Sequence, residues 1–190
     1  MNFQSSDMKK TRYLNSWKGG AWTLLLIAAF SVINILIYAF GSDSYFLFSA
    51  FLPYSIGLWG VDYLLGWYGA PVNVGAGIFF LSISAVIVIV YGILCFFGRK
   101  KVGFLIAGLV LFSLDTIYML YIMIMSGDVT AFIGDCIFHG VGILEIAVGI
   151  DAALKYKKLP EELPVPVEDR SETEGTISAE ETSGISEESR

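Results

Sequence analysis

Histidine and cysteine are scarce in this chain, whose 190 residues include one histidine, His139, and two cysteines, Cys95 and Cys136. Catalytic zinc sites commonly use two or three histidines, so a single one argues against a zinc hydrolase. The cysteines lie near opposite ends of two apolar runs. At about 1.5 Å per residue, their difference in depth exceeds what a disulfide spans. The cysteines therefore indicate neither a disulfide nor redox chemistry.

The chain also lacks the motifs of several functional classes. It contains no glycine loop of the phosphate-binding type, no paired-cysteine zinc motif and no internal repeat of the transporter kind. No serine or cysteine has the spacing from His139 that nucleophilic catalysis needs. Nothing suggests nucleic-acid binding. These absences favour a protein that is not an enzyme and that uses no cofactor.

Charged residues make up only 16% of the chain, whereas hydrophobic residues make up 55% and the mean hydropathy is +0.67. This composition indicates an all-α integral membrane protein. Apolar runs long enough to cross about 30 Å of hydrocarbon predict a bundle of four transmembrane helices. The predicted spans are 21–40, 76–97, 103–125 and 131–154.

The positive charges of the predicted bundle all fall on one side. Lys and Arg residues occur before the first span, between the second and third, and after the fourth, but not in segments 41–75 and 126–130. Short cytoplasmic loops carry such an excess, so we expect a multi-pass protein of the plasma membrane with both termini in the cytoplasm. Residues 1–20 then form a basic cytoplasmic N-terminus. The first span is too long for a cleaved signal peptide and is expected to be retained.

Segment 41–75, between the first two spans, is rich in aromatic residues. A fifth crossing there would place the basic residues 99–101 on the wrong side of the membrane. Proline and glycine residues are also expected to weaken a continuous helix: Pro53, Gly57, Gly60 and Gly66. Aromatic residues recur every four positions, at Trp59, Tyr63 and Trp67. This spacing predicts a short interfacial or re-entrant helix that serves as an aromatic anchor or as a lid over the bundle.

The C-terminal segment 159–190 has a different composition from the bundle. It opens with three prolines and holds ten acidic residues against two arginines. Its few apolar residues cannot offset the entropy lost on ordering it, so we predict a disordered acidic cytoplasmic tail. A solvating tail and a docking element for a cytoplasmic partner both agree with this composition.

Ionisable residues interrupt the third and fourth spans at Asp115, Asp135, His139 and Glu145. Such groups are costly in hydrocarbon and usually mark a pathway, a site or a helix partner. At about 100° per residue, Asp135 and His139 share a helix face with small residues, and Glu145 lies on its flank. Asp115 and His139 lie at similar depths, so we predict that they pair across the hairpin and share a proton. Asn34 in the first span is a candidate fifth member.

Three functions agree with these residues. The favoured one is an accessory or scaffold module in which the polar residues fasten the helices together. The second is a proton- or cation-linked transporter or channel subunit with Asp135, His139, Asp115 and Glu145 as a relay. The third is a membrane-embedded hydrolase in which Asp135, His139 and Asp115 hold a metal of unknown identity. Expected partners are the lipid bilayer, a second copy or another membrane subunit, and a cytoplasmic protein at the tail.

Overall fold

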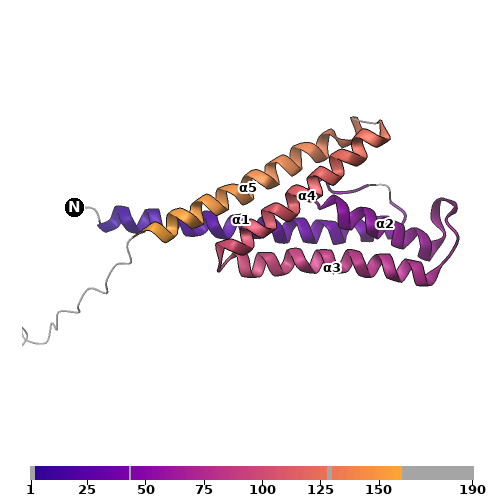
Figure 1. Ribbon diagram of the computed structural model, residues 1–190, viewed down its shortest axis with the longest axis horizontal. Coiled ribbons are helices and arrows are strands. Elements are labelled where there is room, and N and C mark those ends of the chain that lie inside the picture. The colour runs from indigo at the N-terminus through magenta and orange to yellow at the C-terminus, as the bar shows by residue number, and fades with distance from the viewer. Residues whose placement is uncertain (1–2, 43, 128–129, 160–190) are drawn as a thin grey trace, which may run out of the picture. The chain divides into compact units, whose positions relative to one another are not determined.

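The computed structural model describes residues 3–42, 44–127 and 130–159, and within them the chain is all-α (Figure 1). The elements are α1 (Phe3–Ala39), α2 (Phe51–Leu65), η1 (Trp67–Gly69), α3 (Val74–Gly98), α4 (Val102–Ser126), η2 (Thr130–Phe132) and α5 (Ile133–Lys158). Four of these helices, α1, α3, α4 and α5, are long and apolar enough to cross a membrane. The chain is therefore a multi-pass membrane protein with four candidate spans, in agreement with its apolar runs.

The candidate spans follow the predicted runs within a few residues, with one clear difference in α1. This helix begins at Phe3, so most of the basic segment 1–20 is the start of a 37-residue helix. Its apolar part follows without a break. The predicted disordered tail lies outside the described residues from Pro160 onward.

One end of the bundle joins three helices and carries the positive charges. The indole N–H of Trp17 in α1 donates to the carbonyl oxygen of Gly98 at the end of α3, at 2.8 Å. The same indole packs against Tyr156 of α5, with ring centroids 6.0 Å apart. The basic residues 99–101 and 155–158 adjoin these contacts, and we call this the basic end of the bundle.

Helices α1 and α5 approach each other closely through glycines. A Cβ atom added at Gly20 would lie 2.9 Å from the Cα of Gly149 and 3.0 Å from the carbonyl oxygen of Glu145. Both obstacles are backbone atoms, which cannot rotate aside. Small residues permit such contacts between helices in lipid, where packing rather than the hydrophobic effect drives association.

Helix α2 has 15 residues and lies beside α1 and α3 in the half of the bundle away from the basic end (Figure 1). The segment forms a short helix, as predicted, and Pro53, Gly57 and Gly60 lie within it. Pro53 is in the first turn, where a missing N–H costs little. A Cβ atom at Gly60 would lie 3.1 Å from the carbonyl oxygen of Gly77 in α3, so this glycine allows close packing. Gly66, with φ of 70°, ends the helix.

Gly20→Ala should lower the free energy of unfolding by about 1–3 kcal/mol, because the added methyl group forces two backbones apart. Gly19→Ala is the matched control, since its Cβ atom meets nothing within 4 Å. Denaturation of the purified protein in detergent, followed by tryptophan fluorescence, measures both changes. Equal effects of the two substitutions would contradict the close contact between α1 and α5.

Candidate functional site

The chain between α1 and α2 enters the interior of the bundle, where Asn34 of α1 supplies hydrogen bonds that water provides elsewhere. The N–H of Phe46 donates to Oδ1 of Asn34 at 2.7 Å, and Nδ2 of Asn34 donates to the carbonyl oxygen of Phe46 at 2.8 Å. Nδ2 also donates to the hydroxyl of Ser49 at 2.9 Å. Asn34 is fully buried. Its amide therefore fixes the irregular backbone that leads into α2.

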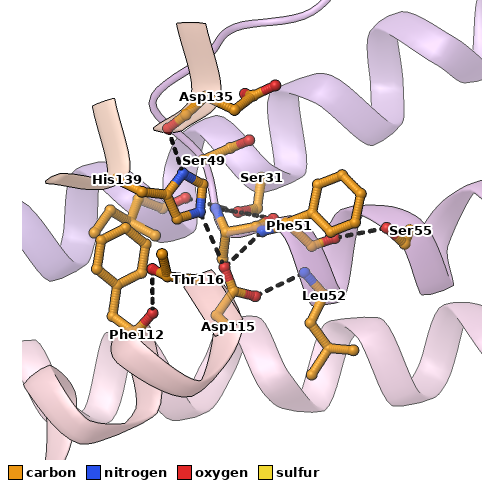
Figure 2. Close-up of polar contacts among 12 residues, drawn as sticks. Ser31, Ser49, Phe51, Leu52, Ser55, Phe112, Asp115, Thr116, Asp135 and His139 are labelled. Atoms are coloured by element: carbon orange, nitrogen blue, oxygen red, sulfur yellow. Dashed lines mark hydrogen bonds and ion pairs between the residues drawn. The ribbon is translucent and has the colours of Figure 1, made fainter. Parts of the chain in front are cut away.

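Side chains from two other helices satisfy the N-terminus of α2 (Figure 2). The N–H of Ala50 donates to the hydroxyl of Ser31 in α1 at 2.9 Å. The next two N–H groups donate to Asp115 of α4: Phe51 to Oδ2 at 2.8 Å and Leu52 to Oδ1 at 2.7 Å. Pro53 follows and has no N–H. The amide groups that a helix leaves without internal partners are thus all accounted for.

His139 of α5 contacts the same carboxylate, as the matched depths of the two residues predict. Its Nε2 lies 3.2 Å from Oδ2 of Asp115, and its Nδ1 lies 2.9 Å from the backbone carbonyl oxygen of Asp135 (Figure 2). Asp115 is 3% exposed and His139 is 1% exposed. The pair therefore lies inside the protein rather than against lipid.

Hydrogen-bonding capacity constrains the protons of this pair. A carbonyl oxygen only accepts, so Nδ1 of His139 carries a hydrogen and donates to Asp135. A hydrogen bond between Nε2 of His139 and Oδ2 of Asp115 needs one hydrogen on one of these two atoms, and the 3.2 Å distance agrees with either placement. That the two side chains share a proton stays a prediction.

Ring packing holds the imidazole in this position. Phe112, nearly one turn before Asp115 on α4, stacks on His139 with ring centroids 4.9 Å apart and planes 11° apart. A Cβ atom at Gly142 would lie 2.7 Å from the Phe112 ring. The small residue at position 142 therefore leaves room for the ring that stacks on the histidine.

Asp135 contacts the segment before α2 instead of completing a charge cluster. Its Oδ2 accepts a hydrogen bond from the hydroxyl of Tyr45 at 2.9 Å. Partial burial and the nearby carboxylate raise the pKa of Tyr45 to about 12, so this hydroxyl keeps its proton at neutral pH. Asp135 thus fastens α5 to the α1–α2 connection at a second point.

Glu145 lies apart from the other predicted site residues. Its side chain is exposed, and its carboxylate accepts a hydrogen bond from the hydroxyl of Thr23 in α1 at 2.8 Å. It therefore belongs to the surface where α1 and α5 meet and does not continue the line from Asp135 through His139. We call the residues that do meet in the interior the buried polar cluster: Ser31, Asn34, Asp115, Asp135 and His139.

The aromatic residues predicted to face the interface pack against two different helices. Trp59 and Tyr63 of α2 both contact Phe80 of α3, with ring centroids 5.9 and 5.7 Å away. Trp67 lies beyond the end of α2 in η1 and contacts Tyr38 of α1 at 5.3 Å. Trp59 keeps 51% of its surface exposed. The four-residue spacing thus predicts a helix that includes Trp59 and Tyr63, but Trp67 lies outside that helix.

Sequence reasoning missed the hydroxyl groups that serve the site. Those of Thr23, Tyr45 and Ser84 donate to Glu145, Asp135 and the carbonyl oxygen of Pro53. Those of Ser31 and Ser49 accept from Ala50 and Asn34. Isolated serine and threonine residues are common in membrane helices, so their positions carry little signal. Within the described parts of the chain, no three His, Cys, Asp or Glu side chains are grouped so that they could hold a metal ion.

Neither models of protein families nor curated proteins nor solved structures match the chain.

Asp115→Asn should lower the free energy of unfolding by about 1–3 kcal/mol, because an amide offers one acceptor oxygen where two N–H groups need acceptors. Amide hydrogen exchange at Phe51 and Leu52 should become faster. Asp151→Asn is the control, since this exposed carboxylate pairs only with Lys155 across one turn. Unchanged exchange at the start of α2 would contradict the role assigned to Asp115.

Proposed function

We propose that this protein is a non-enzymatic membrane scaffold or accessory subunit, in which the buried polar cluster fixes a re-entrant helix, α2, inside a four-span bundle. The observation that carries the proposal is the use of both oxygens of Asp115 by the first two N–H groups of α2. Asp115 lies near the middle of α4, so α2 begins at the depth of mid-span. Irregular backbone at that depth persists only where protein groups satisfy it.

The hydrogen-bonding state of the cluster supports fastening over conduction. Among the described residues, every buried side-chain nitrogen and oxygen has a hydrogen-bond partner. In a proton or ion pathway, charged side chains face a water-filled space that supplies their partners. In the buried polar cluster, backbone groups and neighbouring side chains are the hydrogen-bond partners instead of water. The polar residues therefore act as structural connections among α1, α2, α4 and α5.

The relay alternative rests on the predicted sharing of a proton between Asp115 and His139, whose Nε2 and Oδ2 atoms lie 3.2 Å apart. A relay also needs a group that continues the path toward the other side, and Glu145 was the candidate. Its carboxylate instead lies on the exposed surface and binds Thr23. The path then stops at Asp115, whose oxygens are already occupied by backbone donors.

The distribution of positive charge sets the orientation that we propose. With the basic end in the cytoplasm, α2 enters the bundle from the outer side of the plasma membrane, and both termini are cytoplasmic. Fixing α2 presents exposed aromatic surface at the outer end, including Trp59 and Tyr68, which are 51% and 79% exposed. Lipid or another subunit contacts that surface, and the acidic segment after Leu159 serves cytoplasmic partners.

Purified protein in liposomes should pass no proton current above that of empty liposomes under an imposed pH gradient and membrane potential. A pH-sensitive dye inside the vesicles measures the flux, and a known proton carrier added at the end confirms that the vesicles are sealed. Flux through the wild type that disappears in His139→Gln, with folding retained, would overturn the scaffold proposal in favour of the relay.

A further inference from the structure

Glu145 differs from Asp115, Asp135 and His139 in being exposed. It lies near the middle of α5, a candidate span, yet its side chain is exposed. Its one described hydrogen bond comes from Thr23, which leaves most of the carboxylate's acceptor capacity unused. A carboxylate at this depth facing lipid is costly, and such groups face the bundle or a partner.

The surface around Glu145 is hollowed into a groove of about 450 Å³ between α1 and α5. Its lining residues are Ser16, Gly19, Gly20, Trp22, Thr23, Leu26, Leu144, Glu145 and Val148. Gly149 already occupies the space beside Gly20, but a Cβ atom at Gly19 would meet nothing within 4 Å. The open glycine marks space that the chain itself does not occupy.

The shape of this groove suits another helix. Along α1 it extends from Ser16 to Leu26, a rise of about 15 Å or nearly three turns. Ser16 and Gly19 are small residues in its wall, and small residues permit close contacts between helices in membranes. The remaining walls are largely aliphatic. An elongated apolar groove with a small-residue run and one central carboxylate fits a transmembrane helix that bears a positive charge.

A second copy of this chain does not supply that charge. Residues 19–98 and 102–154 contain no Lys or Arg. The nearest one on α1, Lys18, lies five residues, or about 7.5 Å along the helix, before Thr23 and toward the basic end, so it is not at the depth of Glu145. The single histidine is buried against Asp115. Arg99 lies over the ring of Trp22 at the basic end, and Lys155 pairs with Asp151. Charge complementarity therefore requires a different protein.

We propose that the groove between α1 and α5 binds a transmembrane helix of a different protein, and that a Lys or Arg near the middle of that helix pairs with Glu145. The small residues Ser16 and Gly19 let the partner backbone approach until the two charges meet. This interaction goes beyond the scaffold function and uses residues outside the buried polar cluster.

Two synthetic transmembrane peptides test the proposal on the full-length protein in phosphatidylcholine vesicles. Both are Leu- and Ala-rich helices with one small-residue face. One carries a central Lys, and the other carries Leu at that position. Energy transfer between labelled protein and labelled peptide measures binding. The Lys peptide should bind at least tenfold more tightly than the Leu peptide, and Glu145→Gln should abolish the difference. Asp151→Asn, on the same helix but near its end, should leave the difference intact.

A second pair of variants tests the groove itself. Gly19→Leu fills the open space and should block binding of the Lys peptide. Gly92→Leu is the control, because the Cβ atom at this glycine of α3 also meets nothing within 4 Å. Detergent unfolding checks that each variant folds as the wild type does, and a folded Gly19→Leu protein that still binds would overturn the proposal.

Three further results would overturn the proposal. They are equal binding of the two peptides, displacement of the Lys peptide by tetraphenylphosphonium at micromolar concentration, and self-association of the wild type that Glu145→Gln removes. The second would indicate a site for small lipophilic cations, and the third a homodimer. None of these results bears on proton flux, so failure here is distinguishable from failure of the scaffold function.

Discussion

The hydrogen bonds from the start of α2 to Asp115 are the interaction on which the rest of the bundle depends. A helix that begins in an apolar interior exposes N–H groups that its surroundings cannot satisfy, and each one left alone is costly. One carboxylate with two oxygens meets the N–H groups of Phe51 and Leu52 together. The positive end of the α2 dipole also faces that carboxylate. Without Asp115, these two N–H groups would lose the partners that they have in the structure.

The other residues of the cluster follow from that one requirement. An acid in the middle of a span needs further compensation, and His139 provides it from α5. The imidazole in turn needs a fixed orientation, which the carbonyl oxygen of Asp135 and the ring of Phe112 supply. Gly142 makes room for that ring. A single constraint at the N-terminus of a 15-residue helix thus determines side chains on two of the long spans.

The sequence predicts some features of this arrangement, such as the spans, better than others, such as the contacts of each polar side chain. Apolar runs define the spans because length and hydropathy are properties of the residues themselves, and equal depths on a hairpin identify Asp115 and His139 as partners. The main partner of Asp115 is backbone, however, and backbone amides leave no pattern in a sequence. Glu145 lies about 120° around the helix from His139, enough to reach the surface that α1 borders. A helical wheel gives the direction in which a side chain points, but it does not show which neighbouring helix lies in that direction.

Two carboxylates in the middle of candidate spans therefore have opposite environments. Asp115 is enclosed: N–H groups of α2 donate to both of its oxygens, and His139 of α5 contacts one of them. Glu145 has one donor, from Thr23, beside an open groove. A chain that satisfies its buried polar groups so completely has no folding reason to leave an acid exposed at that depth. The residual capacity of Glu145 then lies in assembly, since a group unsatisfied within one chain is stabilised when a second chain supplies its partner.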